Sequence, residues 1–296
     1  MNPAVLVLTG PTASGKTEAA IRLARELDLE LVNADSLQIF RRLDIGTAKP
    51  TKEELGGIPY HLIDVLNPDE PVTAAWYAQE ASKAIRSILA RGKVPVLVGG
   101  SGFYLRAVEH PPIAGPAPEA DMNPAEMYQR LLEKDPDAAR RIHPNDRYRL
   151  TRASAILSQG LRPSDLWKDA ADKAPSFNFH WVGLHRPKSE LNARIDRRMA
   201  DMFANGLVVE SQTVLEAHPL CKPRLRRAIG YKEALNVLEE GWSVNRAIEQ
   251  AQTATRHYAK RQMTWFRKEP RVEWVPPSEV SDKAREIVGK ILGSPK

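Results

Sequence analysis

Gly10-Pro-Thr-Ala-Ser-Gly-Lys-Thr17 is the stretch of sequence that decides the fold. A short apolar run, Val5 to Thr9, comes directly before it. After it, Glu18 to Leu27 carries apolar residues at helical spacing. The eight residues match the pattern G-x-x-x-x-G-K-[ST], and they stand between a predicted strand and a predicted helix, where that pattern belongs. The sequence therefore predicts a strand, a phosphate-binding loop and a helix in that order.

The residue types in this loop suit an anion. Glycines let backbone N–H groups converge on phosphate oxygens, and the N-terminus of the following helix adds partial positive charge. Lys16 supplies a full positive charge, and the Thr17 hydroxyl is suited to hold a Mg²⁺ ion. The plainer alternative is a glycine turn with a surface lysine. The residues predicted to bind phosphate groups are Gly10, Pro11, Thr12, Ala13, Ser14, Gly15, Lys16 and Thr17.

Further strands and helices alternate along the chain. We predict strands at Leu29–Asn33, Leu62–Val65, Val94–Val98 and His180–Leu184, with an amphipathic helix over Ala74–Arg91. Val94–Val98 has no polar alternation, which is typical of a strand buried on both faces. The predicted fold class is therefore α/β, a parallel sheet of the P-loop NTPase type flanked by helices.

The pattern changes after Arg106. Residues 110–118 hold four prolines and one glycine, and helical patterns follow at Pro124–Lys134 and Arg147–Gln159 with no strand between them. We predict a mostly helical insertion over residues 108–176, with residues 1–107 and 177–296 forming the core. The second part of the core should contain helices at Pro187–Asn205 and Ser243–Lys268, and Pro276–Lys296 is expected to be a loosely held end.

Composition sets wider limits. The chain has 296 residues, 42% of them hydrophobic and 27% charged, as in ordinary globular proteins. Lys and Arg exceed Asp and Glu by 43 to 37, which suits a polyanionic partner but also fits a mildly basic enzyme without one. A single cysteine, Cys221, excludes an internal disulfide framework and a multi-cysteine metal site. The first apolar run is too short for a membrane span and lacks the basic start of a secretion signal, so we expect a cytoplasmic protein with no membrane partner.

Acidic residues limit the reaction classes. A nucleoside triphosphatase or kinase needs an acid at the tip of a buried strand to organise Mg²⁺ and water. Val94–Val98 instead runs into Gly99-Gly100-Ser101, and the acids that follow strands are Asp35 and Asp64. This disfavours an ordinary hydrolase and leaves a small-molecule kinase open.

Several further segments together resemble one family, the tRNA dimethylallyltransferases. They run in the family order along the chain and are far more specific than the phosphate loop alone. Besides the loop they are Asp35-Ser-Leu-Gln38, Asp44-Ile-Gly-Thr-Ala-Lys-Pro50, His61-Leu-Ile-Asp64, Gly99-Gly-Ser-Gly-Phe-Tyr104, His143-Pro-Asn-Asp-Arg147, Ala228-Ile-Gly-Tyr-Lys-Glu233 and the stretch from Thr255 to Arg267.

The resemblance implies a reaction. A dimethylallyl group would pass from dimethylallyl diphosphate to the exocyclic N6 amine of adenosine 37 of a tRNA, beside the anticodon, with release of diphosphate. The phosphate loop would then bind a prenyl diphosphate instead of ATP, with Mg²⁺ as cofactor. The expected partners are dimethylallyl diphosphate and the tRNA anticodon stem-loop, and the protein is expected to be a monomer.

Roles for individual residues follow from this resemblance and from the chemistry. Asp35 is the predicted base that accepts the amine proton, while Lys16 and Ser101 complete the predicted catalytic set. Arg226 or Arg227 should reach the diphosphate. The predicted tRNA contacts are Asp35, Ser36, Leu37, Gln38, Tyr148, Arg149, Leu150, Thr151, Arg152, Tyr231, Lys232, Arg256, Lys260 and Arg261.

Three other functions stay open at this point. An adenylate isopentenyltransferase would use the same chemistry on free nucleotides, although it would need neither the insertion nor the basic helix that begins at Ser243. A small-molecule kinase is favoured by the phosphate loop taken alone. A non-catalytic nucleotide-binding module is the remaining alternative.

Overall fold

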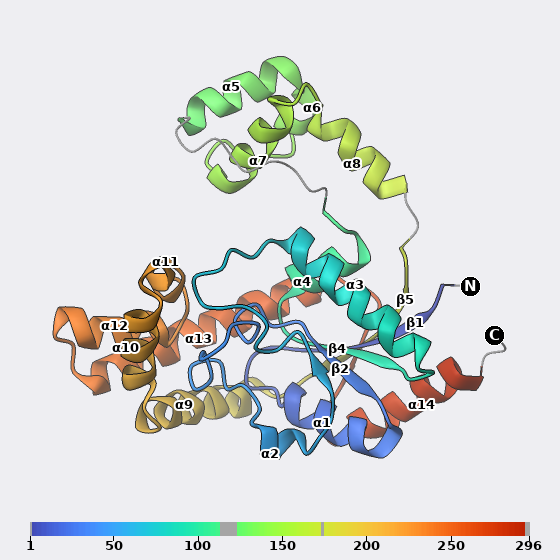
Figure 1. The fold of residues 1–296 in the computed structure, drawn as a ribbon, viewed down its shortest axis with the longest axis vertical. Helices are drawn as coiled ribbons and strands as arrows, with labels where there is room; N and C mark the ends of the chain where they lie inside the picture. Colours follow the sequence, from blue (N-terminus) through green and yellow to red (C-terminus); the bar gives the residue numbers. More distant parts are fainter. Residues whose placement is uncertain (1, 113–122, 173–174, 294–296) are drawn as a thin grey trace. The chain divides into compact units, whose positions relative to one another are not determined.

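The computed structural model describes residues 2–112, 123–172 and 175–293, and it divides into two compact units. The larger unit combines residues 1–109 and 177–296, and the smaller one is formed by residues 110–176 (Figure 1). Residues 113–122 lie outside the described part, and they include most of the proline-rich stretch at residues 110–118.

A six-stranded sheet forms the centre of the larger unit, in the order β3-β2-β4-β1-β5-β6. Every neighbouring pair of strands is parallel. The strands are β1 (Ala4–Thr9), β2 (Glu30–Asn33), β3 (Tyr60–His61), β4 (Pro95–Val98), β5 (Asn178–Leu184) and β6 (Val272–Val275). Because β1 lies between β4 and β5, the loop that follows β1 emerges in the middle of the sheet's carboxyl edge. The predicted α/β parallel fold is confirmed.

Both faces of the sheet are covered. Leu6 and Leu8 of β1 pack with buried residues of α1 (Lys16–Leu27) and α14 (Val280–Gly293). Val5 and Val7 point the other way, into a core that includes α3 (Ala74–Ala90) and α4 (Gly102–Glu109). This alternation is the two-residue period of a strand, and burial on both faces explains why these strands read as continuous apolar runs.

A set of helices follows β5. It comprises α9 (Lys188–Ala204), α10 (Leu207–Ala217), the 3-10 turn η1 (Pro219–Cys221), α11 (Lys222–Leu225), α12 (Tyr231–Glu240) and α13 (Val244–Phe266), whereas the short α2 (Lys52–Leu55) lies earlier in the chain. Helix α13 begins as predicted, because the Ser243 hydroxyl accepts the backbone N–H of Arg246. Within the described residues, no helix is both long and apolar enough to cross a membrane.

The smaller unit is helical in its described part. It contains α5 (Pro124–Lys134), α6 (Pro136–Ala139), α7 (Arg147–Leu157) and α8 (Pro163–Asp172). Met127, Leu131 and Leu150 belong to its own buried cluster. Asp135 is fully buried and ties two helix starts together, since its carboxylate accepts the backbone N–H groups of Ala138 and Ser164 at 3.1 and 2.7 Å.

Two predictions about elements are wrong. Leu62–Val65 is not a strand, because Leu62 and Asp64 have φ angles of 61° and 55°, in the left-handed region that no strand uses. The end of the chain is not loose up to Gly293: Val280, Ala284, Ile287 and Val288 of α14 are buried against the sheet. Their spacing of four, three and one is itself helical, so the sequence held this signal.

Candidate functional site

The phosphate loop connects β1 to α1, and its glycines are required by its shape. Gly10 has a φ of 142°, and a Cβ atom there would lie 2.8 Å from the carbonyl oxygen of Leu184. Gly15 has a φ of 95° and precedes the first residue of α1. Any side chain at Gly10 would collide with β5, so the loop depends on glycine at that position.

Lys16 folds back over this loop. Its Nζ donates a hydrogen bond to the carbonyl oxygen of Pro11 at 2.8 Å. Burial lowers the pKa of Lys16 from 10.5 to about 7, with a further lowering by the Arg198 guanidinium and an opposing effect of the Asp35 carboxylate. The ammonium therefore lies where an added anion would restore its charge.

Three arginines surround the loop, one from the connection between β5 and α9 and two from α9, and sequence reasoning missed all three. Arg186 and Arg194 donate through Nε to the carbonyl oxygens of Ser14 and Ala13, each at 2.8 Å. Arg198 donates to the carbonyl oxygen of Thr47 at 3.1 Å, and burial lowers its pKa. The sequence could have indicated two of these arginines, because Arg194 and Arg198 are four residues apart and so share one face of the predicted helix.

Two buried polar atoms beside the loop have no hydrogen-bond partner among the described residues. They are the hydroxyl oxygen of Ser14 and Nε of Arg198. Buried polar groups are nearly always satisfied in native proteins, so such atoms mark a place that a ligand or water completes.

A cleft of about 990 Å³ opens beside the loop. Its cationic side chains outnumber its acidic ones, which favours a polyanion. The lining residues with charged side chains are Lys16, Glu18, Arg22, Arg25, Asp44, Lys49, Glu54, Arg194, Arg197, Arg198 and Asp201, and Thr17 also lines it.

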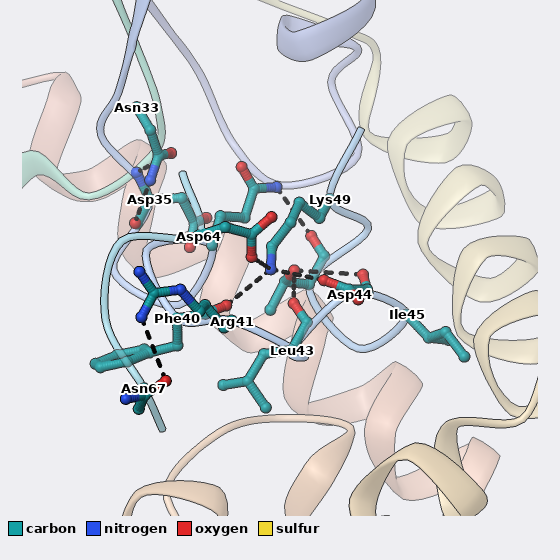
Figure 2. A network of polar contacts seen from close by, with 12 residues as sticks. Asn33, Asp35, Phe40, Arg41, Leu43, Asp44, Ile45, Lys49, Asp64 and Asn67 are labelled. Atoms are coloured by element: carbon teal, nitrogen blue, oxygen red, sulfur yellow. Dashed lines mark hydrogen bonds and ion pairs between the residues drawn. The ribbon is translucent and has the colours of Figure 1, made fainter. Parts of the chain in front are cut away.

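Asp35 lies just beyond β2, at the same edge of the sheet (Figure 2). Its carboxylate Oδ1 accepts the backbone N–H of Leu37 at 2.9 Å, and its own N–H donates to Asn33 Oδ1 at 2.9 Å. Asn33 in turn donates to the carbonyl oxygen of Leu62 at 3.0 Å. One oxygen of the carboxylate is thus held by the local turn, and this fixes the direction of the side chain.

The turn after β4 brings Ser101 to this place. Gly99 packs so closely that a Cβ atom would lie 2.2 Å from the carbonyl oxygen of Ala34, the residue before Asp35. Tyr258 of α13 lies near Ser101, and burial together with the nearby Asp35 charge raises the pKa of Tyr258 to about 12. The structure therefore brings Lys16, Asp35 and Ser101 to neighbouring loops.

Other predicted site residues lie elsewhere. Arg226 pairs with Asn236 and Glu239, and neither it nor Arg227 lines the cleft. The prediction that Tyr231 faces RNA is wrong, because Tyr231 is fully buried and donates its hydroxyl to Glu210.

Leu150 is also wrong as an RNA contact, since it is buried in the core of the smaller unit. Gln38 is buried and donates its amide to the carbonyl oxygens of Thr47 and Ala48. Arg256 pairs with Asp196. The exposed members of the predicted set are Tyr148, Arg149, Arg227, Lys232, Lys260 and Arg261, while Ser36, Leu37, Thr151 and Arg152 are half-buried.

Residues 38–269 match the family model described as IPP transferase. The chain belongs to the IPP transferase family. It is 42% identical to a tRNA dimethylallyltransferase of Anaeromyxobacter sp. (strain Fw109-5), over 96% of this chain and 98% of that one. A tRNA dimethylallyltransferase of Koribacter versatilis is 41% identical, with 93% of each chain covered.

Solved structures of the IPP transferase family agree. A tRNA isopentenylpyrophosphate transferase from Staphylococcus epidermidis is 32% identical, with a TM-score of 0.72 over 97% of this chain and 99% of that one. A eukaryotic dimethylallyltransferase acting on tRNA is 27% identical, with a TM-score of 0.86 over 99% of this chain and 80% of that one. The family predicted from the sequence segments is confirmed, and the kinase and adenylate alternatives are not favoured.

Proposed function

We propose that this chain transfers a dimethylallyl group from dimethylallyl diphosphate to the exocyclic N6 amine of the adenosine beside a tRNA anticodon. One observation carries the proposal. A cationic phosphate loop and the Asp35 carboxylate stand at the same edge of the sheet, close enough for Asp35 to affect the pKa of Lys16. Such a site offers one place for a leaving diphosphate and another for the proton of an attacking amine.

The leaving group is stabilised by the loop. As the bond between the allylic carbon and the diphosphate oxygen breaks, negative charge grows on the diphosphate, and Lys16, Arg198 and the loop N–H groups oppose that charge. These groups are in position before the reaction starts, so little reorganisation is needed.

Mg²⁺ is part of this proposal as a companion of the diphosphate. The described residues contain no cluster of three or more His, Cys, Asp or Glu side chains suited to hold a metal. The Thr17 hydroxyl, which lines the cleft next to Lys16, fits an ion whose other ligands are phosphate oxygens and water. When bound, the ion adds positive charge beside the leaving group.

The nucleophile is prepared at the other end of the site. An adenine exocyclic amine is weakly nucleophilic, because its lone pair is delocalised into the ring. As its nitrogen bonds to the allylic carbon, Asp35 accepts the displaced proton. The Ser101 hydroxyl, on the turn that packs against Ala34, holds the amine or a diphosphate oxygen in line.

tRNA binding is assigned to exposed groups on both units. Tyr148 and Arg149 of the smaller unit offer a base-stacking ring and a phosphate contact, and Lys260 and Arg261 offer phosphate contacts on α13. We further propose that the enzyme acts as a monomer, since every assigned group lies on one chain, and that it works in the cytoplasm, as expected for a tRNA-modifying enzyme.

The function is tested by one transfer assay. The protein is incubated with Mg²⁺, labelled dimethylallyl diphosphate and either unmodified tRNA or AMP. We expect label in tRNA and none in AMP. Label that appears only in AMP would replace this proposal with the adenylate isopentenyltransferase function.

A further inference from the structure

The segment Asp44–Lys49 forms one wall of the cleft, through Asp44, Ile45, Ala48 and Lys49. In the described residues it belongs to no helix or strand. It is a turn with two backbone hydrogen bonds of its own, from Ala48 to Ile45 and from Lys49 to Asp44, and contacts with side chains add to them. Two charged side chains make several of these contacts each, Lys49 from within the segment and Glu210 from α10, and Glu210 lies in no segment that the sequence singled out.

Lys49 holds the segment from within (Figure 2). Its side chain is only 4% exposed, and its ammonium donates to the carbonyl oxygen of Phe40 at 2.7 Å. The same ammonium donates to carboxylate oxygens of Asp44 at 2.6 Å and Asp64 at 2.5 Å. Three acceptors satisfy the three protons of the ammonium, so the ends of the segment are fixed to each other and to the turn after β3.

Glu210 of α10 holds the segment from outside. Its carboxylate accepts three successive backbone N–H groups, from Asp44 at 3.1 Å, Ile45 at 2.8 Å and Gly46 at 3.1 Å. A fourth donor is the buried hydroxyl of Tyr231, at 2.6 Å from the same carboxylate. Hydrogen bonds to a charged acceptor are stronger than neutral ones, and four of them converge here.

Gly46 shows how closely the segment packs against α10 and α12. A Cβ atom at this position would lie 2.5 Å from the ring of Tyr231 and 2.8 Å from Leu207. The segment therefore lies directly on α10 and α12, and no side chain separates its backbone from the aromatic ring.

The Asp44–Lys49 segment is also bonded to side chains that lie next to the proposed reacting groups. The carbonyl oxygen of Thr47, next to Gly46, accepts from Gln38 at 3.1 Å and from Arg198 at 3.1 Å. Gln38 belongs to the turn that begins at Asp35, and Arg198 is the guanidinium beside Lys16. One carbonyl group thus joins the base end of the site to its diphosphate end.

We propose that Glu210 is a positioning residue of the transferase reaction. It holds the Asp44–Gly46 backbone in place. The adjacent Thr47 carbonyl can then accept hydrogen bonds from both Gln38 and Arg198 and fix their positions relative to each other. Glu210 does not line the cleft. The proposal rests on the proposed function, because the reaction that Glu210 supports is the transfer itself. Displacements of about 1 Å in a catalytic arrangement can lower a rate by roughly a hundredfold.

The test compares Glu210→Gln with Glu216→Gln. Both changes remove one negative charge from α10, but Glu216 is exposed and, among the described residues, accepts a hydrogen bond only from Gln212. We expect Glu210→Gln to lower the single-turnover transfer rate, at saturating tRNA and dimethylallyl diphosphate, by roughly tenfold to a hundredfold. Glu216→Gln should change it less than about twofold. Equal rates in the two variants would overturn the proposal.

A second measurement does not depend on activity. Amide hydrogen exchange over residues 40–50 should become faster in Glu210→Gln and stay unchanged in Glu216→Gln. Faster exchange with an unaltered transfer rate would leave the contact standing and overturn the positioning role. A wild-type protein that modifies no tRNA would instead contradict the proposed function, so the two failures are distinguishable.

Tyr231→Phe is a milder variant, for the case in which Glu210→Gln fails to fold. It removes one of the four donors to Glu210 and keeps the ring that packs on Gly46. The transfer rate should fall in the same direction but by less than in Glu210→Gln. A rate at least equal to wild type, with exchange unchanged, would contradict the proposal.

Discussion

Gln262 and Thr12 are joined by a hydrogen bond in which the side-chain carbonyl of Gln262 accepts the backbone N–H of Thr12 at 2.8 Å. The amide nitrogen of the same side chain donates to the carbonyl oxygen of Gly100 at 2.9 Å. A single buried glutamine of α13 thus connects the phosphate loop to the turn that carries Ser101.

Replacing this glutamine should loosen both loops. Gln262→Leu keeps a similar volume but leaves the buried carbonyl oxygen of Gly100 and the partly buried N–H of Thr12 without this partner, at a cost of about 1–3 kcal/mol for a fully buried group. We expect the free energy of unfolding, measured by urea denaturation, to fall by at least about 1–3 kcal/mol. Gln252→Leu is the matched control on the same helix, because Gln252 makes one partly buried bond, to the Asp196 carbonyl oxygen at 3.0 Å. A smaller loss for Gln262→Leu than for the control would contradict the bridging role.

Asp35 is predicted to act as the base. Asp35→Asn keeps an oxygen for the Leu37 N–H but cannot accept the amine proton, and general-base catalysis contributes about 10²–10⁴-fold. The single-turnover transfer rate should fall by that factor, with tRNA affinity within a few-fold of wild type. Asp28→Asn, at an exposed carboxylate paired with Lys93, should leave the rate unchanged. A near wild-type rate for Asp35→Asn would assign the proton to another acceptor.

The pKa of Lys16 gives a dependence on pH. Because burial lowers this pKa to about 7 in the free protein, the side chain is mostly neutral above that pH. A bound diphosphate favours the charged form and raises the pKa, so binding should take up a proton between pH 7 and the raised value, and affinity should fall as pH rises through this range.

Calorimetry in buffers of different ionisation enthalpy measures this uptake. At about pH 8.5 we expect up to roughly one proton to be bound per inorganic diphosphate. Lys16→Arg should show none, because a guanidinium stays charged at this pH. An uptake in Lys16→Arg equal to that of wild type would assign the proton to another group.

Local patterns account for what the sequence predicted well. The loop between β1 and α1 and the starts of α5 and α13 follow from residues next to one another, such as the Ser243 cap. Gln262 and Glu210 act across distances of 250 and about 165 residues along the chain, and nothing local marks them. Tyr231 shows the same limit: a basic neighbourhood favoured an RNA contact, whereas packing against Gly46 decided its burial.

RNA binding by the smaller unit is tested through salt dependence. Tyr148→Ala and Arg149→Ala change exposed side chains, and each should weaken tRNA binding. Loss of one phosphate contact at Arg149 should lower the slope of log affinity against log salt by about 0.7–0.9, whereas Tyr148→Ala should leave the slope unchanged. Lys188→Ala, an exposed charge at the start of α9, is the control. Identical slopes for Arg149→Ala and wild type would contradict a phosphate contact at that residue.

We expect Arg198, and not Arg226, to bind the diphosphate. The sequence pointed to Arg226 or Arg227. The Arg226 guanidinium pairs with Asn236, Glu239 and Glu240, while Arg198 lies beside Lys16 with a buried Nε that has no partner among the described residues. Arg198→Met should therefore weaken the binding of inorganic diphosphate by roughly tenfold to a hundredfold, the worth of a charge-assisted hydrogen bond.

Arg226→Met should leave diphosphate affinity within about twofold and act on stability instead, because it leaves Glu239 without one of its two cationic partners. Affinity from calorimetry and the midpoint of urea unfolding separate the two effects in both variants. A loss of affinity in Arg226→Met with none in Arg198→Met would contradict this prediction. It would show that the basic segment before α12 binds the diphosphate. That result would also require this segment to leave its acidic partners when the substrate binds, since their carboxylates occupy the Arg226 guanidinium in the free protein.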